Sequence, residues 1–583
     1  MIRTKTQMLT LLALAASLAP AFDLDTVGQR SGYAKTGRIE EVAVACEKLK
    51  ALGPERAACD VIGTSPEGRP LHAFTIGQRT PGKPTILVIA GIHAGEIDGK
   101  DATFLLLEEL LNNKLPGVVD VVTLVFVPVY NVDGHERFGK NNRPNQRGPE
   151  EMGWRVTAQN LNLNRDWTKA DAPETRALLA LIEKIDPVVV ADLHVTDGAQ
   201  FQHDIAVIVE PLADDGANAA LVPIAAALST SLQASLKKSG HLPLDFYPSF
   251  ENDDDPTSGV ATGVTPARLT HGYVSRRGRL GVLVETHAWR PSKERVPATA
   301  DLLRGLFTLA KTQAPIWKKA AADVDAAGIA LVGQSVTLAW EVDREKKTMI
   351  DFQGYAYTRE PSAISGALWT RYDETKKQIW QMPLWTTLKA TTTTTAPAAY
   401  AVLPGFAAAV AERLKAHGIA FSILGATRVA DVETFRADEV GFGARPYEGR
   451  MTAKTKGTWK KTPASTLPAG SLIVPVSQPR GRLVVEIFEP GAPESFVGWG
   501  FFNAAFEQKE YMEGYVAELE ARAMLKDPAV RKAFNEKLAS DPAFAKDPEA
   551  RLDFFYRRHP AWDQRKDLLP VVRLSPQALA ATK

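Results

Sequence analysis

Two residues with metal-binding side chains follow a short apolar segment near the start of the chain. His93 and Glu96 come directly after residues 85–90, a continuous apolar run that predicts a buried strand. In an open α/β sheet, ligands bind beyond the carboxyl ends of the strands, so both side chains could turn toward one point. Imidazole and carboxylate occur together in hydrolytic zinc sites. A motif this short also fits a strand end followed by a helix that binds no metal.

Two later strand-like segments end in the same kinds of residue. His194 ends one of them, and Glu285 lies near the end of another. Two histidines and a glutamate with an open fourth position form a catalytic zinc site whose open position holds water. We therefore expect one zinc ion per chain, bound by His93, Glu96 and His194. Zinc lowers the pKa of bound water to about 7, and the free carboxylate of Glu285 could act as general base and pass the proton to a leaving amine.

Polar residues between these strand ends could bind a substrate. Arg165 offers a guanidinium fork and Asn164 an amide, a combination suited to holding a carboxylate at two points. A structural salt bridge is the alternative for this pair. Arg143 is a second cation, which could stabilise a developing oxyanion.

The candidate residues must be positioned by a sheet, and the chain has the pattern of an α/β fold. Apolar strand-like segments alternate with helical patterns from about residue 70 to residue 290. This alternation predicts a mixed, largely parallel central sheet with helices on both faces. Past about residue 315, shorter alternating runs with Trp and Tyr indicate β structure, and helix formers predominate from Trp499 onward. We expect a C-terminal β-rich and helical accessory region.

The length of 583 residues is too great for one ordinary domain. A positively charged start, a short apolar run and small residues near position 20 are typical of a secretory signal, which favours a secreted or periplasmic protein. No later segment is apolar and long enough to span a membrane. The predicted regions are a signal peptide at 1–21, a catalytic domain at 22–315, an accessory α/β or β-rich domain at 316–498 and a helical C-terminal region at 499–583.

Charge and cysteine content narrow the possible partners and metal sites. The formal net charge is +1, so no strong field would attract nucleic acid or a charged membrane. Cys46 and Cys59 are the only cysteines, and they could pair in an oxidising compartment. Two cysteines cannot form a cysteine zinc site, so any metal must use His, Asp or Glu.

Taken in order, these motifs resemble the zinc carboxypeptidase family typified by carboxypeptidase A, including a bacterial secreted branch with a long C-terminal extension. His-x-x-Glu, the Asn-x-Asp-Gly of residues 131–134, Asn-Arg, a strand-end His and a later strand-end Glu follow the family's order. The resemblance implies a carboxypeptidase-like fold and the zinc ligands and general base named above. It also implies that Asn164 and Arg165 hold the substrate's C-terminal carboxylate.

Two family positions do not align unambiguously. For the oxyanion arginine we select Arg143, with Arg147 and Arg155 as rivals. For the substrate-binding tyrosine we select Tyr273, although it lies closer to the late Glu than the family spacing suggests. We give no catalytic role to His271, for which a surface or hydrogen-bonded position is expected.

The expected function is that of a zinc-dependent metallocarboxypeptidase acting on peptides with a free C-terminus. One alternative is a zinc amide hydrolase that acts on acylated amino acids or cell-wall peptides. Another is a non-catalytic relative that binds a peptide end. The sequence has no H-E-x-x-H, no G-x-S-x-G, no P-loop and no G-x-G-x-x-G motif, which argues against several other enzyme classes. The oligomeric state is not indicated.

Overall fold

A computed structural model describes residues 21–582, and the predicted signal peptide lies outside the described residues except for its last position. The centre of the fold is an eight-stranded sheet in the order β1-β2-β4-β3-β5-β9-β6-β7. Strands β4, β3, β5 and β9 run parallel to one another, whereas β1, β2 and β6 pair antiparallel to their inner neighbours. The strands of this sheet are β1 (Ala57–Thr64), β2 (Pro70–Ile76), β3 (Thr85–Ala90), β4 (Thr123–Val127), β5 (Val189–Val195), β6 (Ile205–Glu210), β7 (Pro243–Leu244) and β9 (Leu280–Thr286).

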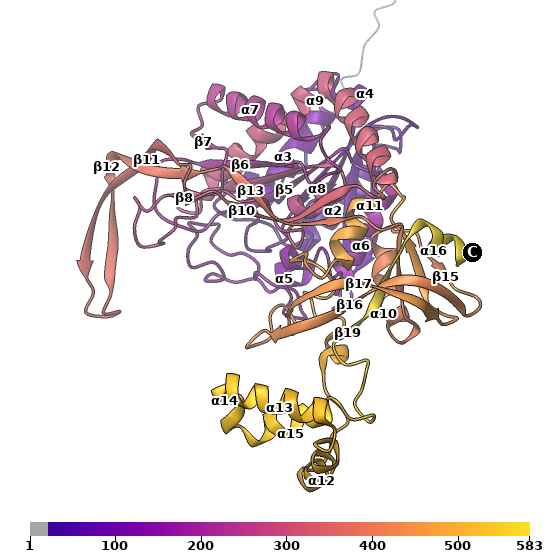
Figure 1. The fold of residues 1–583 in the computed structure, drawn as a ribbon. Coiled ribbons are helices and arrows are strands. Elements are labelled where there is room, and N and C mark those ends of the chain that lie inside the picture. The colour runs from indigo at the N-terminus through magenta and orange to yellow at the C-terminus, as the bar shows by residue number, and fades with distance from the viewer. Residues whose placement is uncertain (1–20, 583) are drawn as a thin grey trace, which may run out of the picture.

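Helices cover both faces of this sheet, as predicted (Figure 1). Every residue of β3, β5 and β9 is buried, which explains why these strands are mostly apolar. Helices α3, α7 and α9 pack together on one face, while α6 and α8 lie on the other (Figure 1). The helices of this part are α1 (Val27–Arg30), α2 (Ile39–Lys50), α3 (Asp98–Leu111), α4 (Val118–Val121), α5 (Val132–Glu136), η1 (Leu163–Arg165), α6 (Pro173–Ile185), α7 (Val222–Lys238), α8 (Thr270–Arg276) and α9 (Ser292–Ile329).

The register of the central strands brings two predicted site residues side by side. In the parallel β5–β9 ladder, His194 pairs with Glu285, and Asp192 pairs with Leu283. A Cβ atom on Gly99 of α3 would lie 2.7 Å from the Cβ atom of Leu193, so Leu193 faces α3. Because side chains alternate along a strand, His194 and Glu285 face the opposite side, where α8 lies.

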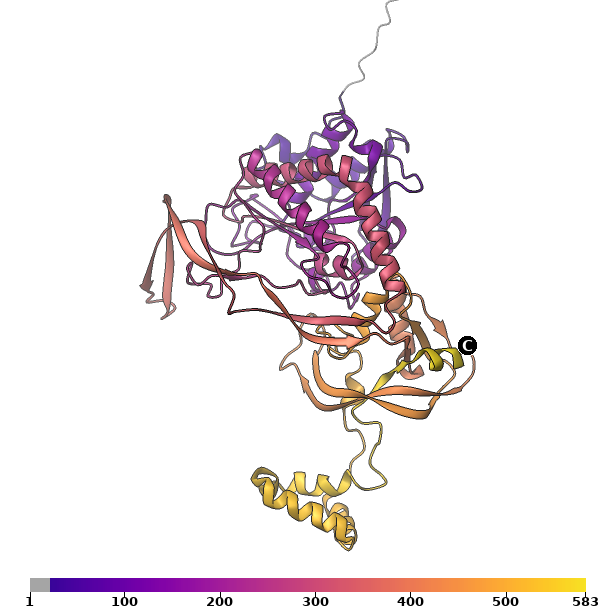
Figure 2. The same cartoon turned by 45° about the horizontal axis from the view of Figure 1, so that its top comes forward.

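Within residues 21–582 there are three further groups of strands, and all of these strands except the short β8 belong to the accessory region. Strand β10 pairs with β13, and the long β11–β12 hairpin pairs with the short β8. This hairpin extends away from the body of the molecule (Figures 1 and 2). The third group is a six-stranded sheet in the order β15-β18-β14-β19-β16-β17. These strands are β8 (Val260–Ala261), β10 (Ser335–Val342), β11 (Thr348–Pro361), β12 (Leu368–Trp385), β13 (Leu388–Thr395), β14 (Ala399–Val402), β15 (Ser422–Ile423), β16 (Arg428–Phe442), β17 (Ala453–Leu467), β18 (Leu472–Pro475) and β19 (Leu568–Leu574).

The boundary predicted at residue 315 and the helical region predicted at 499–583 do not coincide with the ends of helices and strands in the structure. Position 315 falls inside α9, which continues without a break from the catalytic part of the chain to Ile329. The C-terminal region is not wholly helical, because β19 returns to the six-stranded sheet between β14 and β16. Helices α12 to α15 form a separate unit that projects from that sheet (Figure 2). The remaining helices are α10 (Pro404–Ala416), α11 (Gly481–Phe488), η2 (Asn503–Phe506), α12 (Gly514–Met524), α13 (Pro528–Ser540), α14 (Pro542–Lys546), α15 (Pro548–Tyr556) and α16 (Pro576–Ala581).

Two other sequence predictions can be compared with the fold. Cys46 on α2 and Cys59 on β1 form a disulfide bond, as the predicted oxidising compartment allows. Within residues 21–582, the structure contains no helix with the length and apolar character needed to cross a membrane.

Candidate active site

Three side chains converge at the carboxyl ends of β3 and β5. The Nδ1 atom of His93 lies 3.0 Å from Oε1 of Glu96, and Nδ1 of His194 lies 2.9 Å from Oε2 of the same carboxylate. One ligand atom from each residue can be chosen so that all three lie within 4.8 Å of one another. All three side chains are buried. The structure thus brings together the three residues that were predicted as metal ligands.

The outer nitrogens of both imidazoles are held by hydrogen bonds. Nε2 of His93 lies 3.0 Å from Oδ1 of Asn162, and Nε2 of His194 lies 2.8 Å from Oδ2 of Asp192. A histidine that donates from one nitrogen presents the lone pair of the other, so each Nδ1 atom faces the shared centre as an acceptor. With its proton on Nε2, His93 cannot donate from Nδ1 to the nearby carboxylate of Glu96, and Nδ1 is buried without a hydrogen-bond partner among the described residues. Two imidazole nitrogens and a carboxylate, one nitrogen otherwise unsatisfied, fit a zinc ion.

Arginines surround the carboxylate of Glu96. Nη1 of Arg143 lies 2.9 Å from Oε1 of Glu96, and Nη1 of Arg155 lies 3.1 Å from the same oxygen. A Cβ atom at Gly95 would lie 2.5 Å from Cγ of Arg143, so only glycine permits this approach. Arg155 lines the adjoining pocket. The third candidate, Arg147, pairs instead with Glu374 on β12.

Glu285 is buried on β9 beside His194. Its Oε2 atom has no hydrogen-bond partner among the described residues. Burial raises the pKa of Glu285 to about 8; His194 opposes this shift, and the carboxylates of Glu96 and Asp192 add to it. A carboxyl group whose pKa lies near neutrality can both accept and release a proton at working pH.

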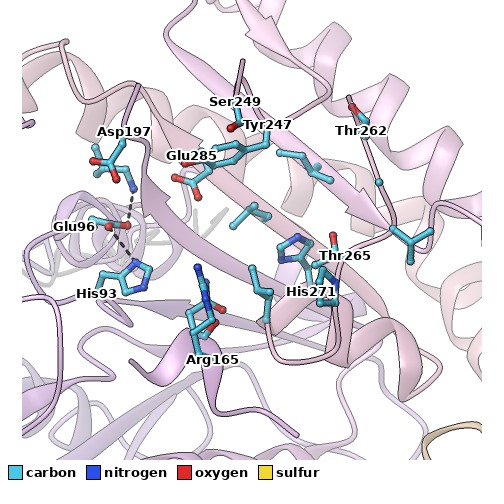
Figure 3. Close-up of a pocket in the computed structure, with 18 of the residues that line it drawn as sticks. His93, Glu96, Arg165, Asp197, Tyr247, Ser249, Thr262, Thr265, His271 and Glu285 are labelled. Carbon is cyan, nitrogen blue, oxygen red and sulfur yellow. Dashed lines mark hydrogen bonds and ion pairs between the residues drawn. The ribbon is translucent and has the colours of Figure 1, made fainter. Parts of the chain in front are cut away.

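These groups open into a pocket of about 460 Å³. Arg165 lines this pocket, as does Asn164, whose Oδ1 accepts a hydrogen bond from the backbone N–H of Thr270 at 3.1 Å. Figure 3 shows Arg165 between the metal-ligand side of the pocket and His271. The other lining residues are Val195, Asp197, Ile208, Tyr247, Ser249, Ala261, Thr262, Gly263, Val264, Thr265, Pro266, Leu269 and Leu283.

The structure does not place Tyr273 at this pocket, and the substrate-binding role predicted for it is corrected. Tyr273 is fully buried on α8, where its hydroxyl lies 2.8 Å from Nδ1 of His417 and its ring packs near Trp167. It is therefore a core residue that joins the catalytic and accessory regions. Tyr247 lines the pocket instead and is 38% exposed. Its ring lies next to Glu285 (Figure 3).

Sequence reasoning also missed Asn162 and Asp197. Asn162 lies two residues before the predicted pair at 164–165, in an alternating Asn-Leu-Asn-Leu-Asn run, and that alternation could have indicated a shared face. Asp197 follows β5 and lies 3.3 Å from Nη2 of Arg143. His271, expected at the surface or hydrogen-bonded, is buried at the pocket wall.

Comparisons with known proteins agree with the resemblance noted in the sequence. Residues 42–239 match the family model of the zinc carboxypeptidases, which confirms that resemblance. Glu285 and Tyr247 lie beyond the matched segment. Carboxypeptidase B of Rattus norvegicus is 25% identical over 167 residues, covering 27% of this chain and 40% of the relative. Mast cell carboxypeptidase A of Homo sapiens is 25% identical over 166 residues, covering 26% of this chain and 39% of the relative.

The chain spans less than half the length of these curated relatives. Among solved structures, the metallo-carboxypeptidase from Burkholderia cenocepacia aligns with a TM-score of 0.35 and 18% identity. That alignment covers 46% of this chain and 68% of the other.

Proposed function

We propose that this protein is a zinc-dependent metallocarboxypeptidase that removes C-terminal residues from peptides. The observation that carries the proposal is the convergence of His93, Glu96 and His194 beside the buried carboxyl group of Glu285. The match over residues 42–239 supports it. We further propose that the protein is secreted or periplasmic, in keeping with the signal sequence predicted for residues 1–21 and with the disulfide bond.

His93, Glu96 and His194 would hold one zinc ion. Zinc, when bound in such a site, lowers the pKa of water and polarises a carbonyl oxygen. The hydrogen bonds that the Nε2–H groups of His93 and His194 donate to Asn162 and Asp192 keep both imidazoles in the tautomer that binds metal.

The remaining steps are carried out by side chains of the protein. Arg165 binds the C-terminal carboxylate of the peptide, which places the last peptide bond beside Glu285. The carboxylate of Glu285 accepts a proton from the attacking water and donates it to the leaving amine nitrogen. The guanidinium groups of Arg143 and Arg155, both in contact with Glu96, stabilise negative charge that develops on the scissile carbonyl oxygen.

A panel of N-blocked dipeptides tests this function. The zinc-loaded protein should hydrolyse dipeptides with a free C-terminal carboxylate much faster than the amidated forms. Equal cleavage of both forms would indicate an amide hydrolase with another specificity. Binding of the free forms without any cleavage would indicate a non-catalytic binding protein.

A further inference from the structure

The wall of the pocket contains a histidine that no step of the proposed reaction uses. His271 lines the pocket and is 3% exposed. Its Nδ1 atom is buried without a hydrogen-bond partner among residues 21–582. A buried polar group that lacks a partner is costly, so its retention inside a binding pocket points to a ligand.

A glycine on β9 allows the helix that carries His271 to pack closely against the sheet. A Cβ atom at Gly281 would lie 2.6 Å from the carbonyl oxygen of His271 and 2.7 Å from its Cα atom. Gly281, Leu283 and Glu285 alternate on one face of β9. Because Gly281 has no side chain, α8 can lie directly on the strand that carries Glu285. This packing places His271 at the same pocket.

The surroundings of His271 restrict the chemistry of a side chain bound there. Leu283 on β9 and Ile208 on β6 are register partners and both line the pocket, and Val264 and Leu269 add to this apolar wall. His271 and Thr265 lie on the far side of the pocket from His93 and Glu96 (Figure 3).

The imidazole of His271 offers a hydrogen bond and no charge. Burial lowers the pKa of His271 to about 3, so the ring is neutral at physiological pH. A charged side chain bound against this wall would lose its hydration without an opposite charge to compensate. A pocket of about 460 Å³ has room for a large side chain.

We propose that His271 is a specificity-determining residue that selects a large, uncharged C-terminal side chain ending in a hydrogen-bonding group, tyrosine in preference to phenylalanine. This inference rests on the proposed function, since it assigns the part of the pocket beyond Arg165 to the substrate's last side chain. The phenol hydroxyl would bond the imidazole, whereas phenylalanine would leave the imidazole unsatisfied. Sites built to bond a hydroxyl discriminate against the analogue that lacks it.

The test compares matched N-blocked dipeptides that end in Tyr or Phe. The wild-type protein should show a kcat/KM about ten-fold higher for the Tyr substrate, because one buried hydrogen bond is worth roughly that factor. His271→Leu should reduce the ratio to about one while retaining activity on the Phe substrate, which also reports that the variant is folded. His271→Gln, which restores a hydrogen-bonding group, should recover part of the preference.

His203→Leu is the matched control, because His203 is also a largely buried histidine but lies outside the pocket lining. It should leave the Tyr-to-Phe ratio unchanged. Equal rates on both substrates in the wild type, a preference that survives in His271→Leu, or best substrates ending in Lys, Arg, Asp or Glu would each overturn the assignment. If no dipeptide is cleaved, the proposed function is wrong, and calorimetric Kd values for the same two dipeptides decide whether His271 selects between them.

Discussion

The carboxylate of Glu448 accepts a hydrogen bond from the backbone N–H of Asn162 at an N···O distance of 2.9 Å. Glu448 belongs to the connection between β16 and β17 of the six-stranded sheet, whereas Asn162 contacts His93 and the backbone N–H of Asn164. The accessory region therefore contacts the turn that orients one of the proposed metal ligands and carries the proposed carboxylate clamp. Through this contact the accessory region supports the candidate active site.

Removing this contact should weaken the site without touching any reacting group. We expect Glu448→Ala to lower zinc affinity and kcat/KM by up to about ten-fold, the lower end of the range for groups that support metal ligands. Glu439→Ala is the matched control, since Glu439 lies on the same hairpin and pairs with the exposed Lys456. A competition titration with a zinc chelator measures the affinity. Equal zinc affinities in the two variants would show that the contact is not a support.

Loss of one ligand should release the metal. In His194→Ala, the remaining His93 and Glu96 offer only two protein ligands, so we expect less than stoichiometric zinc after dialysis and loss of activity. Elemental analysis of the dialysed protein measures the zinc content. His559→Ala serves as the comparison, because His559 lies beyond α15 and far from the site in sequence. Full zinc content in His194→Ala would remove this histidine from the ligand set.

Glu285→Gln should separate metal binding from turnover. The amide occupies nearly the same volume as the carboxyl group but cannot accept the proton of the attacking water, so we expect unchanged zinc content and a kcat lower by about 10²- to 10⁴-fold. Steady-state kinetics on a blocked dipeptide, together with metal analysis, test this. Turnover at the wild-type rate would exclude Glu285 as the base.

Arg165→Ala should harm only substrates with a free C-terminal carboxylate. A charge-assisted bond to a carboxylate contributes about 1.5–3 kcal/mol, which corresponds to a loss of roughly 10- to 100-fold in kcat/KM. The residual rate on amidated dipeptides should be unchanged. A parallel loss on both kinds of substrate would show that Arg165 maintains the pocket and does not bind the carboxylate.

The central sheet and the grouping of four site residues could be predicted because both depend on local sequence. Buried parallel strands have continuous apolar sequences, and their carboxyl ends meet at one edge. His93, Glu96, His194 and Glu285 all follow or end such strands, and the structure brings them to one place. The position of each of these residues relative to a predicted strand end was enough to predict that they lie together.

The tyrosine and the accessory contacts could not be predicted in this way. Whether Tyr247 or Tyr273 faces the pocket depends on how α8 packs on β9, which the spacing of residues in the chain does not determine. Pairing of β19 with β14 joins segments separated by about 170 residues, and no local pattern encodes such a contact. The bond from Glu448 to Asn162 has the same long-range origin.

His241 should make the stability of the catalytic region depend on pH. Hydrogen bonds to Asp204 and Asp301, at 2.6 and 3.1 Å, raise the pKa of His241 from 6.5 to about 9. Because the folded state binds the proton more tightly, the stabilisation is complete below pH 6.5 and is lost as the pH rises through 9. His241→Gln should therefore lower the free energy of unfolding by about 1–3 kcal/mol at pH 6 and by much less at pH 10. Thermal midpoints of the two proteins at both pH values measure the difference, and a deficit that is equal at pH 6 and pH 10 would mean that the imidazole carries no charge in this contact.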